Sequence, residues 1–173
     1  MNRPSRISIA LLAVVALAAV AIVGTSASSA AKKKPTLSVA KTGLGKVLVD
    51  AKGRTLYELE ADGKNKSTCS GACAQFWPPS IAPKKPTVGT GVSKSRLKVI
   101  KRSDGKKQLS YNGHPLYTYS GDSAKGDTNG EGINAFGGFW YVVSGKGKPV
   151  TSASSTGSGT TTGSTDPNPY PGY

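Results

Sequence analysis

Few side chains in this sequence could support chemistry, and the loop that follows Tyr117 holds the densest group of them. The stretch "DSAKGDTNGE" contains Asp122, Asp127, Asn129 and Glu131. Carboxylate and amide oxygens in a glycine-rich loop are ligands that suit Ca²⁺, so these four residues are the candidate metal ligands. Their spacing is not that of an EF-hand, and a nearby lysine would oppose a bound cation.

The two cysteines of the chain are the second candidate. Cys69 and Cys73 are separated by three residues, and a disulfide is the default for such a pair in an exported protein. The bridge would fix a turn just before Trp77. The alternative is a soft-metal or redox pair, and two thiolates would suit Cu(I). The spacing differs from the Cys-x-x-Cys of thioredoxin-like sites and from that of haem attachment.

Catalytic arrangements find less support. His114 is the only histidine, and no residue at a recognisable spacing would orient it as a general base. Asp62 and Asp122 could be the two acids of a glycoside hydrolase. Each of them, however, precedes a Gly- and Lys-rich loop, where an Asp typically accepts backbone N–H bonds two residues on. The sequence therefore predicts a protein that is not an enzyme and has no cofactor.

These residues belong to a pattern that occurs twice. The decapeptide "GRTLYELEAD" returns sixty residues later as "GHPLYTYSGD", and a Phe-Trp pair follows each copy. This order predicts tandem repeats over about residues 37–82 and 95–149. One copy buries too little apolar surface to be stable alone. We expect the two copies to pack as a small sandwich or to share one sheet.

Apolar residues alternate with polar ones inside each copy, which predicts an all-β fold of antiparallel hairpins. Asp104-Gly105 and Asn112-Gly113 predict tight turns of type I′, which require positive φ. The only helical candidate is a turn at "GACAQF".

The aromatic residues have two interpretations. Tyr117 and Tyr119 lie two apart on one predicted strand and therefore on the same face. They could pack in the core, or they could form an exposed shelf for a glycan or a hydrophobic ligand. The first copy has Leu59 at the second aromatic position, so any shelf would be asymmetric.

The ends of the chain differ from its centre. Residues 1–31 have the basic start, the apolar run and the small residues of a signal peptide, and an uncleaved membrane anchor is the alternative. A basic linker is expected at 32–36 and the two-repeat domain at 37–149. The remainder, 150–173, is rich in Ser, Thr, Gly and Pro and predicts a disordered tail.

The charge of the chain is strongly positive. It has 23 Lys and Arg against 9 Asp and Glu, a formal net charge of +14, which becomes +12 without Arg3 and Arg6 of the expected signal peptide. Such a charge favours anionic cell-wall or surface polymers as partners. No motif for specific nucleic-acid recognition is present.

The combined motifs resemble a bacterial secreted-repeat family described as predicted lipoproteins with a Yx(FWY)xxD motif. The segment "YTYSGD" fits the motif, "YELEAD" fits it except at Leu59, and "CSGACAQFWPP" resembles the cysteine element of the family. The residues matching the family pattern are Tyr57, Asp62, Trp77, Tyr117, Tyr119, Asp122 and Trp140. The resemblance implies export but no activity. Lipid attachment does not carry over, because no cysteine lies near the expected cleavage site.

The sequence therefore predicts an exported, non-catalytic binding or interaction module, secreted or associated with the cell wall and without a membrane span after signal cleavage. The alternative is a protein that binds a metal or small ligand through the loop from Asp122 to Glu131 or through the Cys69/Cys73 pair.

Overall fold

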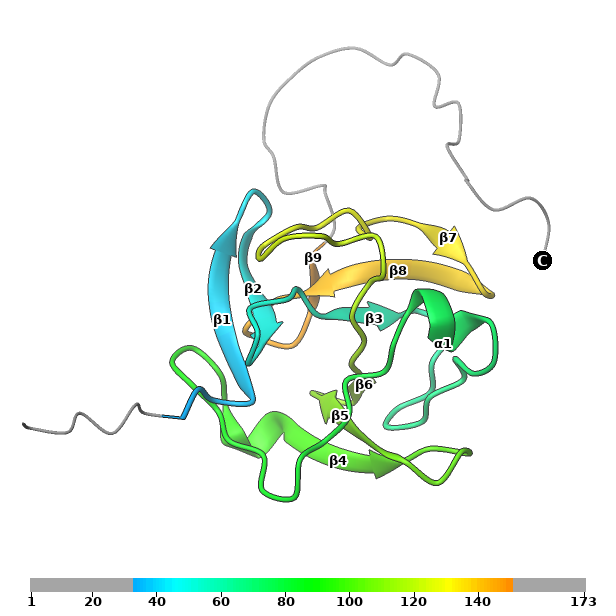
Figure 1. The fold of residues 1–173 in the computed structure, drawn as a ribbon, viewed down its shortest axis with the longest axis horizontal. Coiled ribbons are helices and arrows are strands. Elements are labelled where there is room, and N and C mark those ends of the chain that lie inside the picture. The colour runs from blue at the N-terminus through cyan, green and yellow to red at the C-terminus, as the bar shows by residue number, and fades with distance from the viewer. Residues whose placement is uncertain (1–32, 151–173) are drawn as a thin grey trace, which may run out of the picture. The chain divides into compact units, whose positions relative to one another are not determined.

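The computed structural model describes residues 33–150, which form an almost entirely β structure (Figure 1). This confirms the predicted fold class. The elements, in chain order, are β1 (Leu37–Thr42), β2 (Gly45–Asp50), β3 (Tyr57–Leu59), α1 (Cys73–Phe76), the 3₁₀ turn η1 (Lys94–Arg96), β4 (Leu97–Lys101), β5 (Lys107–Tyr111), β6 (His114–Pro115), β7 (Asn134–Ala135), β8 (Gly138–Val143) and β9 (Pro149–Val150).

Each copy begins with an antiparallel hairpin, β1–β2 in the first and β4–β5 in the second, and β6 extends the latter. Asn112 and Gly113 have φ of 53° and 98°, as a type I′ turn requires. At Asp104-Gly105 only Gly105 has positive φ, so the prediction of a type I′ turn was wrong there. The N–H of Arg102 donates to the carbonyl of Lys106, so the loop between these residues is longer than the two-residue loop of a type I′ hairpin.

The two copies exchange strands. β3 of the first copy pairs with β8 of the second, with Leu59 opposite Trp140. The reciprocal pairing joins Tyr117 of the second copy to Pro79 of the first. The copies therefore share a sheet at β3–β8, which was one of the two predicted packing arrangements.

Two apolar clusters fill the interior. One holds the aromatic residues of both motifs, the disulfide and Val47, Val49 and Val142. The other is rich in leucines that are equivalent in the two repeats: Leu48 and Leu109, and Leu56 and Leu116, all with 0% exposure. Both clusters draw on both copies, so the core belongs to neither repeat alone.

The boundaries of the described region bear on two expectations. The expected signal peptide lies outside the described residues, as does the expected tail apart from Val150. Val150 lies in β9 and pairs with Val142 of β8, so it belongs to the sheet. Within residues 33–150, no helix has the length and apolar character needed to cross a membrane.

Candidate functional site

The two motif copies meet at a reciprocal pair of backbone hydrogen bonds. The N–H of Tyr57 donates to the carbonyl of Tyr117 over 2.9 Å, and the N–H of Tyr117 donates to the carbonyl of Tyr57 over 3.0 Å. Equivalent residues of the two repeats therefore contact each other as they would across a two-fold axis.

Each motif tyrosine donates its hydroxyl to the motif aspartate of the other copy. Tyr57 bonds Asp122 Oδ2 over 2.8 Å, and Tyr117 bonds Asp62 Oδ2 over 2.6 Å. Burial, reinforced by the neighbouring carboxylate, raises the pKa of both phenols far above the usual range. The phenols are therefore neutral donors, and the motif joins one repeat to the other.

The second oxygen of each aspartate closes the loop that follows it. Asp62 Oδ1 accepts the N–H and the hydroxyl of Thr68, and Asp122 Oδ1 accepts the N–H of Asn129. These donors lie six and seven residues on, not two as in an Asx turn. Burial raises the pKa of both carboxyls, while the hydrogen bonds act in the opposite direction.

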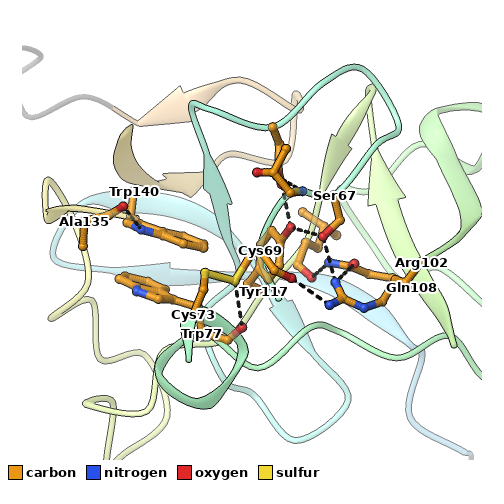
Figure 2. Close-up of a disulfide and its surroundings, with 12 residues drawn as sticks. Ser67, Cys69, Cys73, Trp77, Arg102, Gln108, Tyr117, Ala135 and Trp140 are labelled. Atoms are coloured by element: carbon orange, nitrogen blue, oxygen red, sulfur yellow. Dashed lines mark hydrogen bonds between the residues drawn. A yellow bond between two sulfur atoms is a disulfide. The ribbon is translucent and has the colours of Figure 1, made fainter. Parts of the chain in front are cut away.

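The motif aromatics form a stack in the core. Figure 2 shows that the indoles of Trp77 and Trp140 lie parallel. Their ring centroids are 3.9 Å apart, and the Tyr119 ring stacks on Trp77 with a centroid distance of 4.3 Å. Tyr57 and Tyr117 each contact the tryptophan of their own copy edge-on. Tyr57, Tyr117 and both tryptophans have 0% exposure, so they are core residues and do not form a shelf.

The sulfur atoms of Cys69 and Cys73 lie at disulfide-bonding distance, with Cα atoms 5.3 Å apart. Both residues are buried beside the tryptophan stack, and Cys73 is the first residue of α1. The pair thus lies just before Trp77, as the sequence predicted, and it holds the turn that leads into the stack.

The buried guanidinium of Arg102 lies on the other side of the cysteine pair, and no sequence motif predicts its burial. The side chain of Arg102 is 2% exposed and donates to the Cys69 carbonyl, to Ser67 Oγ and to Gln108 Oε1 at 2.7–2.8 Å (Figure 2). Ser67 also bonds the Tyr117 hydroxyl. Arg102 therefore stabilises the first-copy loop from the second copy.

The acidic loop after Tyr117 uses its carboxylates internally. Asp127 Oδ2 accepts the N–H groups of Ser123 and Ala124, and Glu131 Oε2 accepts the N–H of Val142 over 2.6 Å. Across residues 33–150 the structure contains no group of three His, Cys, Asp or Glu side chains that could hold a metal ion. The four candidate ligands are therefore not brought together as a cation site.

The acidic side chains of the described region share this inward use. The hydrogen bonds of Asp62, Asp122, Asp127 and Glu131 are given above, and the remaining carboxylates also contact a nearby polar group: Asp50, Glu58, Glu60 and Asp104. Six of these eight side chains are buried or half-buried, and Glu60 and Asp104 are exposed. The charge that faces solvent is therefore dominated by lysine.

Two lysine pairs hold equivalent positions in the two repeats. Lys41 lies directly opposite Lys46 across β1–β2, and Lys101 lies directly opposite Lys107 across β4–β5. All four side chains are exposed. In the part of the chain that the structure describes, none of them forms an ion pair with a carboxylate. Like charges opposite each other destabilise a sheet, so this arrangement has a cost in both repeats.

The fold and the motif define a class of protein, a β module built from two interlocked repeats. A family model described as a secreted repeat of unknown function matches residues 38–80 and 98–144, and the chain belongs to that family. The family is described as secreted. Comparisons with curated proteins and with solved structures find no match.

Proposed function

We propose that this protein is an exported, non-catalytic module that binds anionic polymers of the cell surface through its two lysine pairs. The observation that carries the proposal is the Lys41/Lys46 pair and its counterpart Lys101/Lys107. Each pair places two positive charges side by side without a compensating acid. A bound polyanion would turn that repulsion into attraction.

The state of the motif supports a non-catalytic role. Tyr57, Tyr117, Asp62 and Asp122 are hydrogen-bonded to each other across the repeats, and the tryptophans are buried. These contacts satisfy the hydroxyl and carboxyl groups of the four motif residues. The motif therefore acts in the fold, and the exposed lysines remain available to a partner.

The position of the pairs favours a polymer over a small anion. They belong to two different hairpins, β1–β2 and β4–β5, which Figure 1 shows at separate parts of the molecule. A long polyanion can contact both pairs, and the second contact then forms at a high effective concentration. A single small anion can contact only one.

Binding of long-chain polyphosphate, with dextran as the neutral control, would test this proposal. We expect affinity to fall steeply with added salt, because exposed charges are screened within about 10 Å at 0.1 M. Lys41→Gln/Lys46→Gln and Lys101→Gln/Lys107→Gln should each weaken binding about fivefold, which corresponds to about 0.5 kcal/mol for each of the two exposed charges.

The matched control is Lys84→Gln/Lys85→Gln, which removes two exposed adjacent lysines that are not opposite each other in a hairpin. It should weaken binding by less than half as much as either pair. Equal losses in all three double variants would show that only net charge matters, and the proposal for the pairs would then be rejected.

A further inference from the structure

A cavity of about 580 Å³ lies between β1–β2, the loop before η1 and the turn from β8 to β9. Its apolar wall includes Val39 and Val92, which also pack on the leucine-rich cluster. This volume falls within the range of sites that bind small molecules, about 300–1,000 Å³. None of the residues that line the cavity is acidic.

Two glycines bring the loops that line the cavity close to Val39. A Cβ on Gly145 would lie 2.8 Å from a Val39 methyl and 2.9 Å from the Gly91 carbonyl oxygen. Gly91 has a φ of +81°, and a Cβ there would lie 3.1 Å from the same valine. The two loops therefore pack directly against Val39 through their backbones, and neither position has room for a side chain.

The walls are held in place by a buried tyrosine. The Tyr111 hydroxyl accepts the N–H of Ser93 and donates to the Gly145 carbonyl, which joins the two loops at 2.9 and 3.0 Å. Tyr111 has 0% exposure. At the mouth, Arg96 Nη1 donates to the Lys146 carbonyl over 2.9 Å and ties the same loops again. The cavity is therefore formed before any ligand arrives, which lowers the entropic cost of binding.

Positive charge surrounds the mouth. Lys46, Arg96 and Lys146 line the cavity, together with the hydroxyl residues Ser93 and Ser144. Arg96 is anchored by one N–H, and its other donors suit the paired oxygens of a carboxylate. A lining that combines an apolar wall with three cations is complementary to a molecule with an apolar body and one anionic end.

We infer that this cavity binds a small amphipathic anion, a short acyl or aromatic group that carries a carboxylate. The inference goes beyond polymer binding, because the cavity has an apolar wall between two loops and a volume that suits a short molecule. Its apolar wall would be of no use to a polyanion. A simple inorganic anion, in turn, would leave that wall unfilled.

The experiment titrates sodium octanoate, 1-octanol and inorganic phosphate into the whole protein and records amide chemical shifts. We expect octanoate to shift the amides of Gly91, Ser93 and Gly145, and to bind at least tenfold more tightly than either control. Lys146→Glu should weaken octanoate binding about tenfold or more, because the new carboxylate occupies Arg96 in place of the ligand.

Lys148→Glu is the matched control, since it makes the same charge change in the same turn at an exposed residue that does not line the cavity. It should change octanoate affinity less than twofold. Equal binding of octanoate and phosphate would show an adventitious ion only, and equal binding of octanol would show an apolar cavity without anion selectivity. Either of these results would overturn the inference. It would also be overturned if octanoate did not bind, or if Lys146→Glu and Lys148→Glu weakened octanoate binding equally. Lys46 belongs both to the cavity lining and to the first lysine pair, but Lys146 and Lys148 belong to neither pair, so their variants test the cavity separately from polyphosphate binding.

Discussion

Glu58→Gln should make the protein more stable, and the gain should depend on pH. Glu58 lies on β3 with its side chain 5% exposed, and its Oε2 has no hydrogen-bond partner in the described structure. Its Oε1 lies 3.4 Å from His114 Nδ1. Burial, with added repulsion from Asp62 and Glu131, raises the pKa of Glu58 from 4.5 to about 7.

The sign follows from the proton balance. Between pH 4.5 and 7 the folded protein holds a proton on Glu58 that the unfolded chain has released, so stability falls as pH rises through this window. A shift of this size corresponds to about 3 kcal/mol at pH 8. Burial lowers the pKa of His114, so the contribution of this residue makes stability rise with pH in the range just below the ordinary pKa of histidine. Because His114 contacts Glu58, repeating the comparison in a His114→Gln background separates the two contributions.

The assay is urea-induced unfolding of both proteins, with the disulfide intact, at four pH values from 4.5 to 8. The stability of Glu58→Gln relative to wild type should increase by about 3 kcal/mol over this range, with most of the change between pH 5 and 7. Glu60→Gln, at an exposed position two residues on, is the control and should show no such increase. A difference between Glu58→Gln and wild type that stays constant with pH would refute the reasoning.

Three further changes test two contacts between the repeats and the disulfide within the first repeat. Tyr117→Phe should lower the free energy of unfolding by about 1.5–3 kcal/mol, because it removes a hydroxyl bonded to the partly buried Asp62. Urea-induced unfolding measures this loss, and a value below about 0.5 kcal/mol would show that the bond contributes little net stability. Gly130→Ala should lower the free energy of unfolding by about 1–3 kcal/mol, because the new Cβ would lie 2.7 Å from the Trp77 ring. Near-ultraviolet circular dichroism should report the disturbed stack. An unchanged spectrum and an unchanged urea midpoint would argue against this packing. Replacing Cys69 and Cys73 by Ser should cost about 2 kcal/mol and leave the fold intact, whereas complete unfolding would mean that the bridge is essential.

Elements with a local signal could be predicted from the sequence. Alternation of apolar and polar residues predicts β4 and β5, and Asn112-Gly113 predicts the turn that follows them. The repeated landmarks predict two copies with a common core. The Asp104-Gly105 turn shows the limit of such signals, since Gly105 alone takes up the positive φ and a longer loop closes the hairpin.

The contacts between copies had no local signal. Tyr57 and Asp62 are five residues apart in one motif, which suggests that they act together, yet each bonds a residue of the other repeat. The sequence pattern is the same whether the partner is local or distant. Arg102 was missed for a related reason, because a lone arginine beside Asp104 reads as a surface residue and its burial depends on a loop of the other copy.

The reciprocal contact of Tyr57 and Tyr117 has a consequence for how such a protein can arise. Contacts in which equivalent residues meet each other are those of an isologous homodimer interface, and strands exchanged between the halves are those of a domain-swapped dimer. In this chain the segment between the repeats links the two halves covalently, so their association no longer depends on protein concentration. A chain with only one repeat would need a second molecule to complete its tyrosine–aspartate bonds, and duplication within one gene removes that need.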